Sequence, residues 1–280
     1  MNKSTMSVVV MVLLTLAICP ATAVAGGVGG GVCVYTIDVA TTLGKVPLAL
    51  EAAFGEIEDG LATYGVPQQD LDEISAAFDD LVNDIELAAA DFPLLLPVPL
   101  IGGSIEFSVP FLVIDAVRFS GGGLSDRFVW GMLDAFGLER PQWPIEESFQ
   151  EGELEVEVTI DPSFSSFMLS TELVKRLDLL VAGIEFGLGF DLAQGKIDPG
   201  VTITASHLQS ELDDALAALH PDELSWSAFC GHACVGVEVG PPFLRLYGRA
   251  RFLLPLSQST TWWGIKVGAL TGSVGLVIRF

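Results

Sequence analysis

From about residue 100 to the C-terminus, apolar and polar residues alternate with a period of two, as in "ELEVEVTID", "GIEFGLGFD" and "LRLYGRARF". Successive side chains of a β-strand point to opposite faces, so this period predicts strands with one apolar and one polar face. The polar faces of three segments carry the charged residues Glu153, Glu155, Glu157, Glu185, Arg245, Arg249 and Arg251. Two architectures show such a pattern: a soluble antiparallel sheet protein and a membrane barrel whose apolar faces contact lipid.

The N-terminal segment predicts export. Residues 1–25, "MNKSTMSVVVMVLLTLAICPATAVA", have one lysine, a short apolar run and small residues before a glycine, which is the order of a secretory signal peptide. Beyond it we find no uninterrupted apolar run of roughly 18 residues, the length that a membrane helix needs. Such a chain can cross a membrane only as a closed barrel, because its strands then satisfy all their backbone hydrogen bonds.

The distribution of charge favours the barrel over the soluble sheet. Three of the eight arginines lie on one face of the segment 245–251, and an acidic ladder lies on one face of the segment 153–157. In a membrane barrel such ladders point into the lumen, where acid and base neutralise each other. We therefore predict a packed, salt-bridged lumen, with a charged constriction for a small solute as the alternative.

Eight segments show the alternation, and they lie at about 104–119, 151–160, 164–174, 178–191, 199–206, 233–239, 243–254 and 261–280. We predict an all-β membrane barrel of about eight antiparallel strands over residues 99–280, just wide enough to be filled by its own side chains. Pro110 interrupts the first segment, so that strand is either bent or really two. A change of parity near residues 268–272 predicts a β-bulge or a separate hairpin.

Residues 26–98 are expected to form a flexible glycine-rich leader at 26–31, a short strand at 32–38 and then an acidic helical hairpin on the periplasmic side. Apolar residues recur at spacings of three and four over residues 46–61 and 71–85, which predicts two amphipathic helices. Twelve acidic residues and no Lys or Arg lie between Glu51 and Asp91. This acidity indicates either a solvated face or a docking surface for a basic partner or cations. Further helices are expected in the long connections 120–150 and 207–232.

The C-terminus carries a resemblance to a known class. In "TGSVGLVIRF" the apolar residues Val274, Leu276, Ile278 and Phe280 alternate with other residues, and Phe280 ends the chain. This ending resembles the C-terminal signal of bacterial outer-membrane β-barrel proteins. The resemblance covers about ten residues; it implies recognition by the barrel-assembly machinery and contact with outer-membrane lipid, and it implies no activity.

Cysteines in an exported chain most often form disulfides, and Cys230 and Cys234 in "CGHAC" are the candidate pair. Metal binding through Cys230, His232 and Cys234 is the alternative, although a fourth ligand is not identifiable and the spacing is weak for zinc. Cys33 then has no assigned partner. We predict no metal and no cofactor.

The composition limits the kinds of partner that the chain can bind. The chain carries 13 basic and 36 acidic residues, so its surface repels nucleic acid and anionic headgroups. Its hydrophobic content of 50% and mean hydropathy of +0.54 exclude a disordered acidic chain.

We predict no enzyme. The neighbours Ser206 and His207 would point to opposite faces of a strand, and the chain has no G-x-S-x-G, phosphate-loop or H-E-x-x-H motif. The predicted function is structural, or narrow passive transport of small or apolar molecules across the bacterial outer membrane. The alternative is a soluble periplasmic α+β protein that binds a small or apolar ligand.

Overall fold

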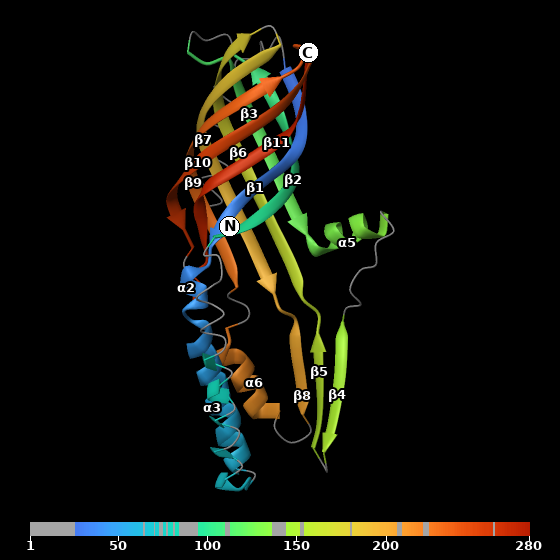
Figure 1. Cartoon of the computed structure of the whole chain (residues 1–280), viewed down its shortest axis with the longest axis vertical. Helices are drawn as coiled ribbons and strands as arrows, with labels where there is room; N and C mark the ends of the chain where they lie inside the picture. Colours follow the sequence, from blue (N-terminus) through green and yellow to red (C-terminus); the bar gives the residue numbers. More distant parts are fainter. Residues whose placement is uncertain are drawn as a thin grey trace.

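The computed structural model describes residues 26–280 apart from positions 64, 70, 73–74, 77, 81, 84–94, 110–112, 136–143, 152–153, 180, 206–208, 221–223 and 260. Eight antiparallel strands close into a barrel in the order β1-β11-β10-β9-β7-β6-β3-β2 (Figure 1). Their bounds are β1 Gly26–Asp38, β2 Leu95–Ser108, β3 Ala116–Ser125, β6 Ser163–Leu179, β7 Ala182–Asp198, β9 Ser225–Val239, β10 Leu244–Gln258 and β11 Lys266–Arg279. The predicted fold class is confirmed. The predicted signal peptide lies outside the described residues.

The glycine-rich segment 26–31, which we expected to be a flexible leader, instead continues the short strand expected at 32–38 and forms β1 with it; β1 closes the barrel between β11 and β2. The barrel therefore begins at Gly26 and not at residue 99. Because glycine has no side chain, a glycine-rich strand shows no alternation of apolar and polar residues in the sequence. Glycines are required here because a Cβ on Gly31 would lie 2.2 Å from the carbonyl oxygen of Val274, and one on Gly102 would lie 2.0 Å from that of Gly121.

Two of the expected barrel strands lie outside the barrel. The segments 151–160 and 199–206 form β5 (Leu154–Ile160) and β8 (Val201–Ala205), which join β4 (Ile145–Glu151) in a separate sheet of order β4-β5-β8. Alternation indicates that a strand has two different faces, but it does not indicate which sheet the strand joins. The expectation of eight barrel strands still holds, because β1 and the division of segment 104–119 replace the two that are lost.

Two irregularities expected from the sequence are present. The first segment is two strands, β2 and β3, joined by residues 109–115. The β1–β11 register shifts between Tyr35, which pairs with Thr271, and Ile37, which pairs with Val267, so residues 268–270 form a bulge opposite Thr36. The bulge adds two residues to β11, so the alternation of faces is kept and both Val267 and Thr271 are buried.

The two ends of the barrel differ in their connections. At the C-terminal end, the short connections 109–115, 180–181 and 240–243 join the strands, and Gly26 exchanges backbone hydrogen bonds with Phe280. The long connections lie at the opposite end (Figure 1). They contain α2 (Ala40–Leu43), α3 (Val46–Thr63), α5 (Asp126–Ala135), α6 (Gln209–Ala218) and the three-stranded sheet.

The acidic helices are therefore at the end of the barrel opposite to the one expected. The chain crosses the barrel in β1 before it reaches α3, so the helices cannot lie beside the termini. Helical residues between 68 and 83 pack back on α3, with the rings of Phe54 and Phe78 stacked 4.1 Å apart. Within the described parts of the chain, none of the helices combines the length and apolar character needed to cross a membrane.

Candidate functional site in the barrel lumen

Charged side chains fill the half of the lumen nearest the C-terminus. They come from seven of the barrel strands, and most are buried from solvent. The members are Arg118, Arg176, Arg245, Arg249, Arg251, Arg279, Glu106, Glu172, Glu185, Glu238, Asp178 and Asp191. We call this set the charged layer. It holds six of the eight arginines of the chain, matched by six carboxylates.

Arg118 on β3 is the centre of the charged layer. Its guanidinium lies 3.2 Å from Glu106, 2.9 Å from Glu172 and 2.7 Å from Glu185, and its side chain is 1% exposed. Glu106 also pairs with Arg176. Because buried charges are tolerated only when they are paired and hydrogen-bonded, these contacts hold β2, β3, β6 and β7 in one register.

A second group of ion pairs links β9, β10 and β11. Glu238 on β9 lies 2.5 Å from Arg279 on β11 and 3.5 Å from both Arg245 and Arg249 on β10. Arg249 also pairs with Glu185, which links this group to Arg118. The ring of Tyr247 lies 3.6 Å from the Arg249 guanidinium carbon and adds a cation–π contact. The network is thus continuous around the barrel.

A histidine and a serine share one carboxylate in the charged layer. Asp191 lies 2.6 Å from Nδ1 of His232, and it accepts a hydrogen bond from the Ser170 hydroxyl. Arg251 donates to Ser170 at 3.0 Å. A nucleophilic serine needs the histidine as its direct base, whereas here Asp191 stands between Ser170 and His232. The arrangement therefore fits an ion network better than a catalytic one.

Glycines that face the lumen make room for these large side chains. A Cβ on Gly187 would lie 1.9 Å from Oε1 of Glu172, and one on Gly236 would lie 2.8 Å from Cγ of Glu185. Glu172 and Glu185 thus each lie over a residue of the neighbouring strand that has no side chain. These glycines alternate with apolar residues in the sequence, so their spacing is the signal that could have identified a tightly filled lumen.

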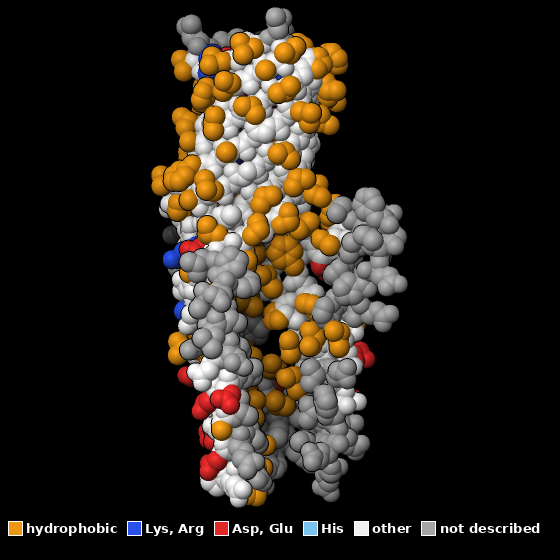
Figure 2. Space-filling model, in the orientation of Figure 1, with side chains coloured by type: hydrophobic (Ala, Val, Ile, Leu, Met, Phe, Trp, Pro, Cys, Tyr) orange, Lys and Arg blue, Asp and Glu red, His pale blue; other side chains and the backbone are white. Residues whose placement is uncertain are grey.

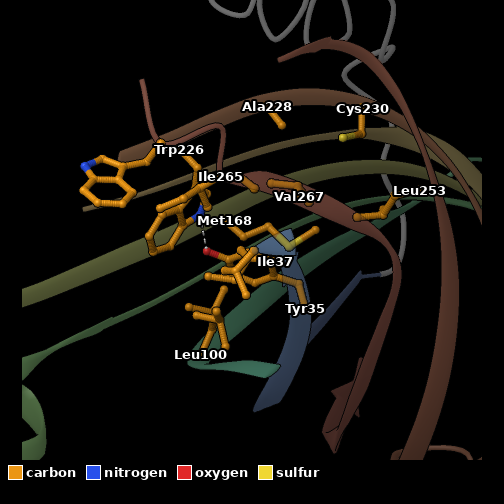
Figure 3. Close-up of a cluster of buried hydrophobic side chains, with 14 of the residues drawn as sticks. Tyr35, Ile37, Leu100, Met168, Trp226, Ala228, Cys230, Leu253, Ile265 and Val267 are labelled. Carbon is orange, nitrogen blue, oxygen red and sulfur yellow. Dashed lines mark hydrogen bonds between the residues drawn. The ribbon is translucent and has the colours of Figure 1, made fainter. Parts of the chain in front are cut away.

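The other half of the lumen is apolar. Tyr35, Ile37, Leu100, Met168, Trp226 and Leu253 are among its buried side chains (Figure 3). The Trp226 indole donates to Tyr35 Oη at 2.8 Å, and that oxygen also bonds to Ser166 at 2.5 Å. Trp263 covers the cluster toward α6 and donates to the carbonyl of His220 at 3.0 Å. We call this set the apolar layer.

The predicted charge ladders are partly brought together. Glu185, Arg245, Arg249 and Arg251 all lie buried in the charged layer. Glu157 instead lies exposed on β5 of the small sheet, 3.5 Å from the Thr204 hydroxyl. Glu155 is on the same strand, and Glu153 lies outside the described residues. Of the expected acidic partners, Glu185 does pair with arginines, whereas Glu157 does not lie in the lumen; unpredicted residues such as Glu106, Glu172 and Glu238 provide further charge.

The predicted disulfide is absent. Cys230 and Cys234 are free thiols on β9, and both are buried in the lumen. Four residues of extended chain separate them by about 13 Å, and a disulfide needs Cα atoms within about 7 Å. The sequence assigned residues 207–232 to a long connection, whereas β9 already begins at Ser225. The described residues hold no group of His, Cys, Asp or Glu arranged to bind a metal. Cys33 lies 3.4 Å from the Thr271 hydroxyl.

The residues of the C-terminal signal face outward. Val274, Leu276 and Ile278 are 62%, 49% and 56% exposed on β11, and Phe280 follows at its end. Their recognition by an assembly machinery stays a prediction.

The outer surface completes the description of the barrel. Large apolar side chains are spread over the half that encloses the charged layer, and acidic side chains gather on the helices at the other end (Figure 2). On β7 the outward residues are apolar from Ile184 to Leu192, and then become Gln194, Lys196 and Asp198. The fold is thus a barrel with a polar inside and an apolar outside over this half, the polarity of membrane barrels.

Comparisons with known proteins add little to this description. No protein-family model and no curated protein matches the chain. Two solved structures of Ail, the attachment invasion locus protein of Yersinia pestis, cover 91% of this chain and 98% of Ail at 10% identity, with TM-scores of 0.38 and 0.34. Neisserial surface protein A covers 91% of this chain and 95% of its own at 7% identity, with a TM-score of 0.33. At these values the likeness carries no inference about activity.

Proposed function

We propose that this chain is an outer-membrane protein whose filled barrel anchors an acidic extension at the cell surface. The observation that carries the proposal is the inversion of polarity along the strands. On β7, apolar residues face outward beside the inward Glu185 and Asp191, and farther along polar residues face outward beside the inward Ala193 and Ile197. The first half suits lipid outside, and the second half suits water.

The lengths agree with this assignment. The outward apolar positions of β7 run from Ile184 to Leu192, and a tilted strand needs about 9–11 residues to cross the bilayer core. The 17 residues of β7 therefore continue beyond the bilayer. Barrels of this class place short turns in the periplasm and long connections outside the cell. The same rule puts α3, α6 and the small sheet on the outer surface.

The packing of the lumen supports an anchor over a transport route. Ion pairs fill one half, and aromatic and aliphatic side chains fill the other. A solute would have to displace buried ion pairs and then a buried apolar cluster. A soluble protein that binds an apolar ligand is also disfavoured, because such a protein would turn its large apolar side chains toward the ligand and not toward the solvent.

Protease treatment of intact cells tests the proposal. We expect external protease to cut within the connections that contain α3 and α6, and to leave a resistant barrel in the membrane fraction. The matched control is an epitope inserted in the short turn 240–243, which should be cut only after the outer membrane is permeabilised. Extraction of the chain by carbonate without detergent, or cutting at the short turn in intact cells, would refute the anchor. Slower migration of the heated than of the unheated protein in detergent gels is expected.

A further inference from the structure

A cavity of about 50 Å³ lies within the lumen, between the glycine-rich wall of β1, β2 and β3 and the arginines of β10. Its lining includes Ser104, Ser120, Ser170, Ser273, Arg249 and Arg251, and none of the described residues around it is Asp or Glu. One water occupies at least about 10–15 Å³ by the same measure, so the cavity has room for a few waters or a small ion. Its walls offer donors and no negative charge.

Both arginines have unused hydrogen-bonding capacity. Nη2 of Arg249 and Nε of Arg251 have no hydrogen-bond partner among the described residues, although Arg249 is 7% and Arg251 is 6% exposed. The carboxylates nearest to Arg251, those of Glu172 and Asp191, lie 3.8 and 3.7 Å away, beyond hydrogen-bond distance. Buried charged donors without partners are costly, so a ligand that accepts hydrogen bonds would stabilise the layer.

When only the buried carboxylates are counted, the charged layer has one positive charge in excess. Six guanidinium groups face five buried carboxylates, and the sixth carboxylate, Asp178, has a side chain that is 55% exposed at the rim. Because water at the rim screens Asp178, its carboxylate offsets little of the positive charge of the buried guanidinium groups. Asp178 pairs with Arg245, so the weakly compensated charge lies on β10, the strand that also carries Arg249 and Arg251 of the cavity wall.

We propose that this cavity binds one small monovalent inorganic anion of the chloride class, held by Arg249, Arg251 and the serine hydroxyls. The guanidinium N–H groups and the hydroxyls of Ser120 and Ser273 donate to the anion, which neutralises the excess charge. The site is independent of the proposed function, because it requires only that the barrel fold. It is a structural ligand site, formed when the barrel closes.

Crystals of the folded, detergent-solubilised protein grown in sodium bromide test the proposal, because bromide replaces chloride and scatters anomalously. We expect an anomalous peak in contact with both guanidinium groups. Density for water alone in the cavity, without an anomalous peak, would overturn the proposal. The wild-type protein decides this result without any variant.

Ser120→Asp places a carboxylate in the cavity, where it would take the position of the anion. This variant should therefore lack the bromide peak. The matched control is Ser165→Asp, which makes the same change at an exposed position near the start of β6, away from the cavity. This variant should retain the peak. A peak that persists in Ser120→Asp would contradict the assignment. In solution, replacing gluconate by chloride at constant ionic strength should raise the urea midpoint of the wild type and of Ser165→Asp, and leave that of Ser120→Asp unchanged. An equal urea midpoint of the wild type in chloride and in gluconate would also overturn the proposal.

Discussion

The lumen near the C-terminus is packed with ion pairs, whereas the lumen beneath α3 and α6 is packed with aromatic and aliphatic side chains. The difference follows the surroundings of each half. Where the outward face is apolar, the strands turn their polar face inward and must pair every charge; where the outward face is polar, they turn an apolar face inward, as soluble proteins do. The same eight strands thus fill one half of the lumen with charged side chains and the other half with apolar side chains.

The largest effect is expected for Arg118→Met in the charged layer. Removal of its guanidinium leaves Glu106, Glu172 and Glu185 without their shared partner, which should lower the free energy of unfolding by about 3–5 kcal/mol. Urea unfolding of the protein in lipid vesicles, followed by tryptophan fluorescence, measures the change. A loss below about 1 kcal/mol would mean that the pairs are not buried as described.

Leu253→Ala is the corresponding change in the apolar layer. Leu253 is 1% exposed, so its truncation leaves a cavity and should cost about 2–5 kcal/mol in the same experiment. The neighbouring Leu254 is 59% exposed on the outer face, and Leu254→Ala should cost less than about 1 kcal/mol. Equal losses for the two variants would contradict the assignment of inward and outward faces.

Tyr35→Phe tests the polar contact within the apolar layer. The change leaves the Trp226 indole N–H without its acceptor in a buried site, which should cost about 1–3 kcal/mol. Because Trp226 is 2% exposed, we also expect a shift of its fluorescence emission when the partner is lost. Unchanged stability together with unchanged emission would show that this hydrogen bond does not form.

A smaller and pH-dependent effect is expected outside both layers, in the turn before β3. Burial raises the pKa of Asp115, but hydrogen bonds from the Arg176 backbone N–H and the Lys175 ammonium outweigh it, so this pKa lies below its ordinary value. The carboxylate therefore stabilises the fold above the unfolded pKa of about 3.9, and the benefit is lost as the pH falls through the lower folded value.

Asp115→Asn should cost less than about 1 kcal/mol near neutral pH, because the Lys175 pair is partly exposed and screened. The difference from the wild type should disappear in acid. Urea midpoints measured from pH 7 down to pH 3 would reveal this convergence, and a difference that grows toward low pH would reverse the sign of the proposed contribution.

No effect is expected from a reducing agent. Cys230 lies in the apolar layer and Cys234 beside the charged layer, and neither is part of a disulfide. A disulfide would contribute about 2–4 kcal/mol, so equal urea midpoints with and without reductant are expected. Mass spectrometry after alkylation of the unfolded chain should find both thiols free; a bridged peptide would contradict the extended conformation of β9.

Part of this structure could be predicted from the sequence. The alternation that repeats in residues 178–191 and 243–254 predicts two-faced strands, and the arginines at 245, 249 and 251 share a face in any strand. The irregularity in β11 was also expected from the change of apolar parity, although that change arises because Val267 faces inward whereas Leu270 and Val274 face outward. These features depend only on neighbouring residues.

The remainder depends on contacts between distant residues. The first half of β1 was missed because its glycines carry no pattern, and β5 was misplaced because an alternating strand fits either sheet. The partners of Arg118 come from three other strands and are fixed only by register. A single glutamate such as Glu172 gives no ladder, so the sequence does not identify it as part of the lumen.

Nitroxide labels at two outward positions of β7 test the inversion of polarity most directly. Phe186→Cys lies beside the charged layer, and Lys196→Cys lies beyond Leu192, beside the apolar layer. After labelling of the folded protein in vesicles, oxygen should relax the label at residue 186 more strongly than a water-soluble nickel complex does. The order should reverse at residue 196. Preferential relaxation by nickel at both positions would contradict the membrane assignment, because both outward faces would then lie in water.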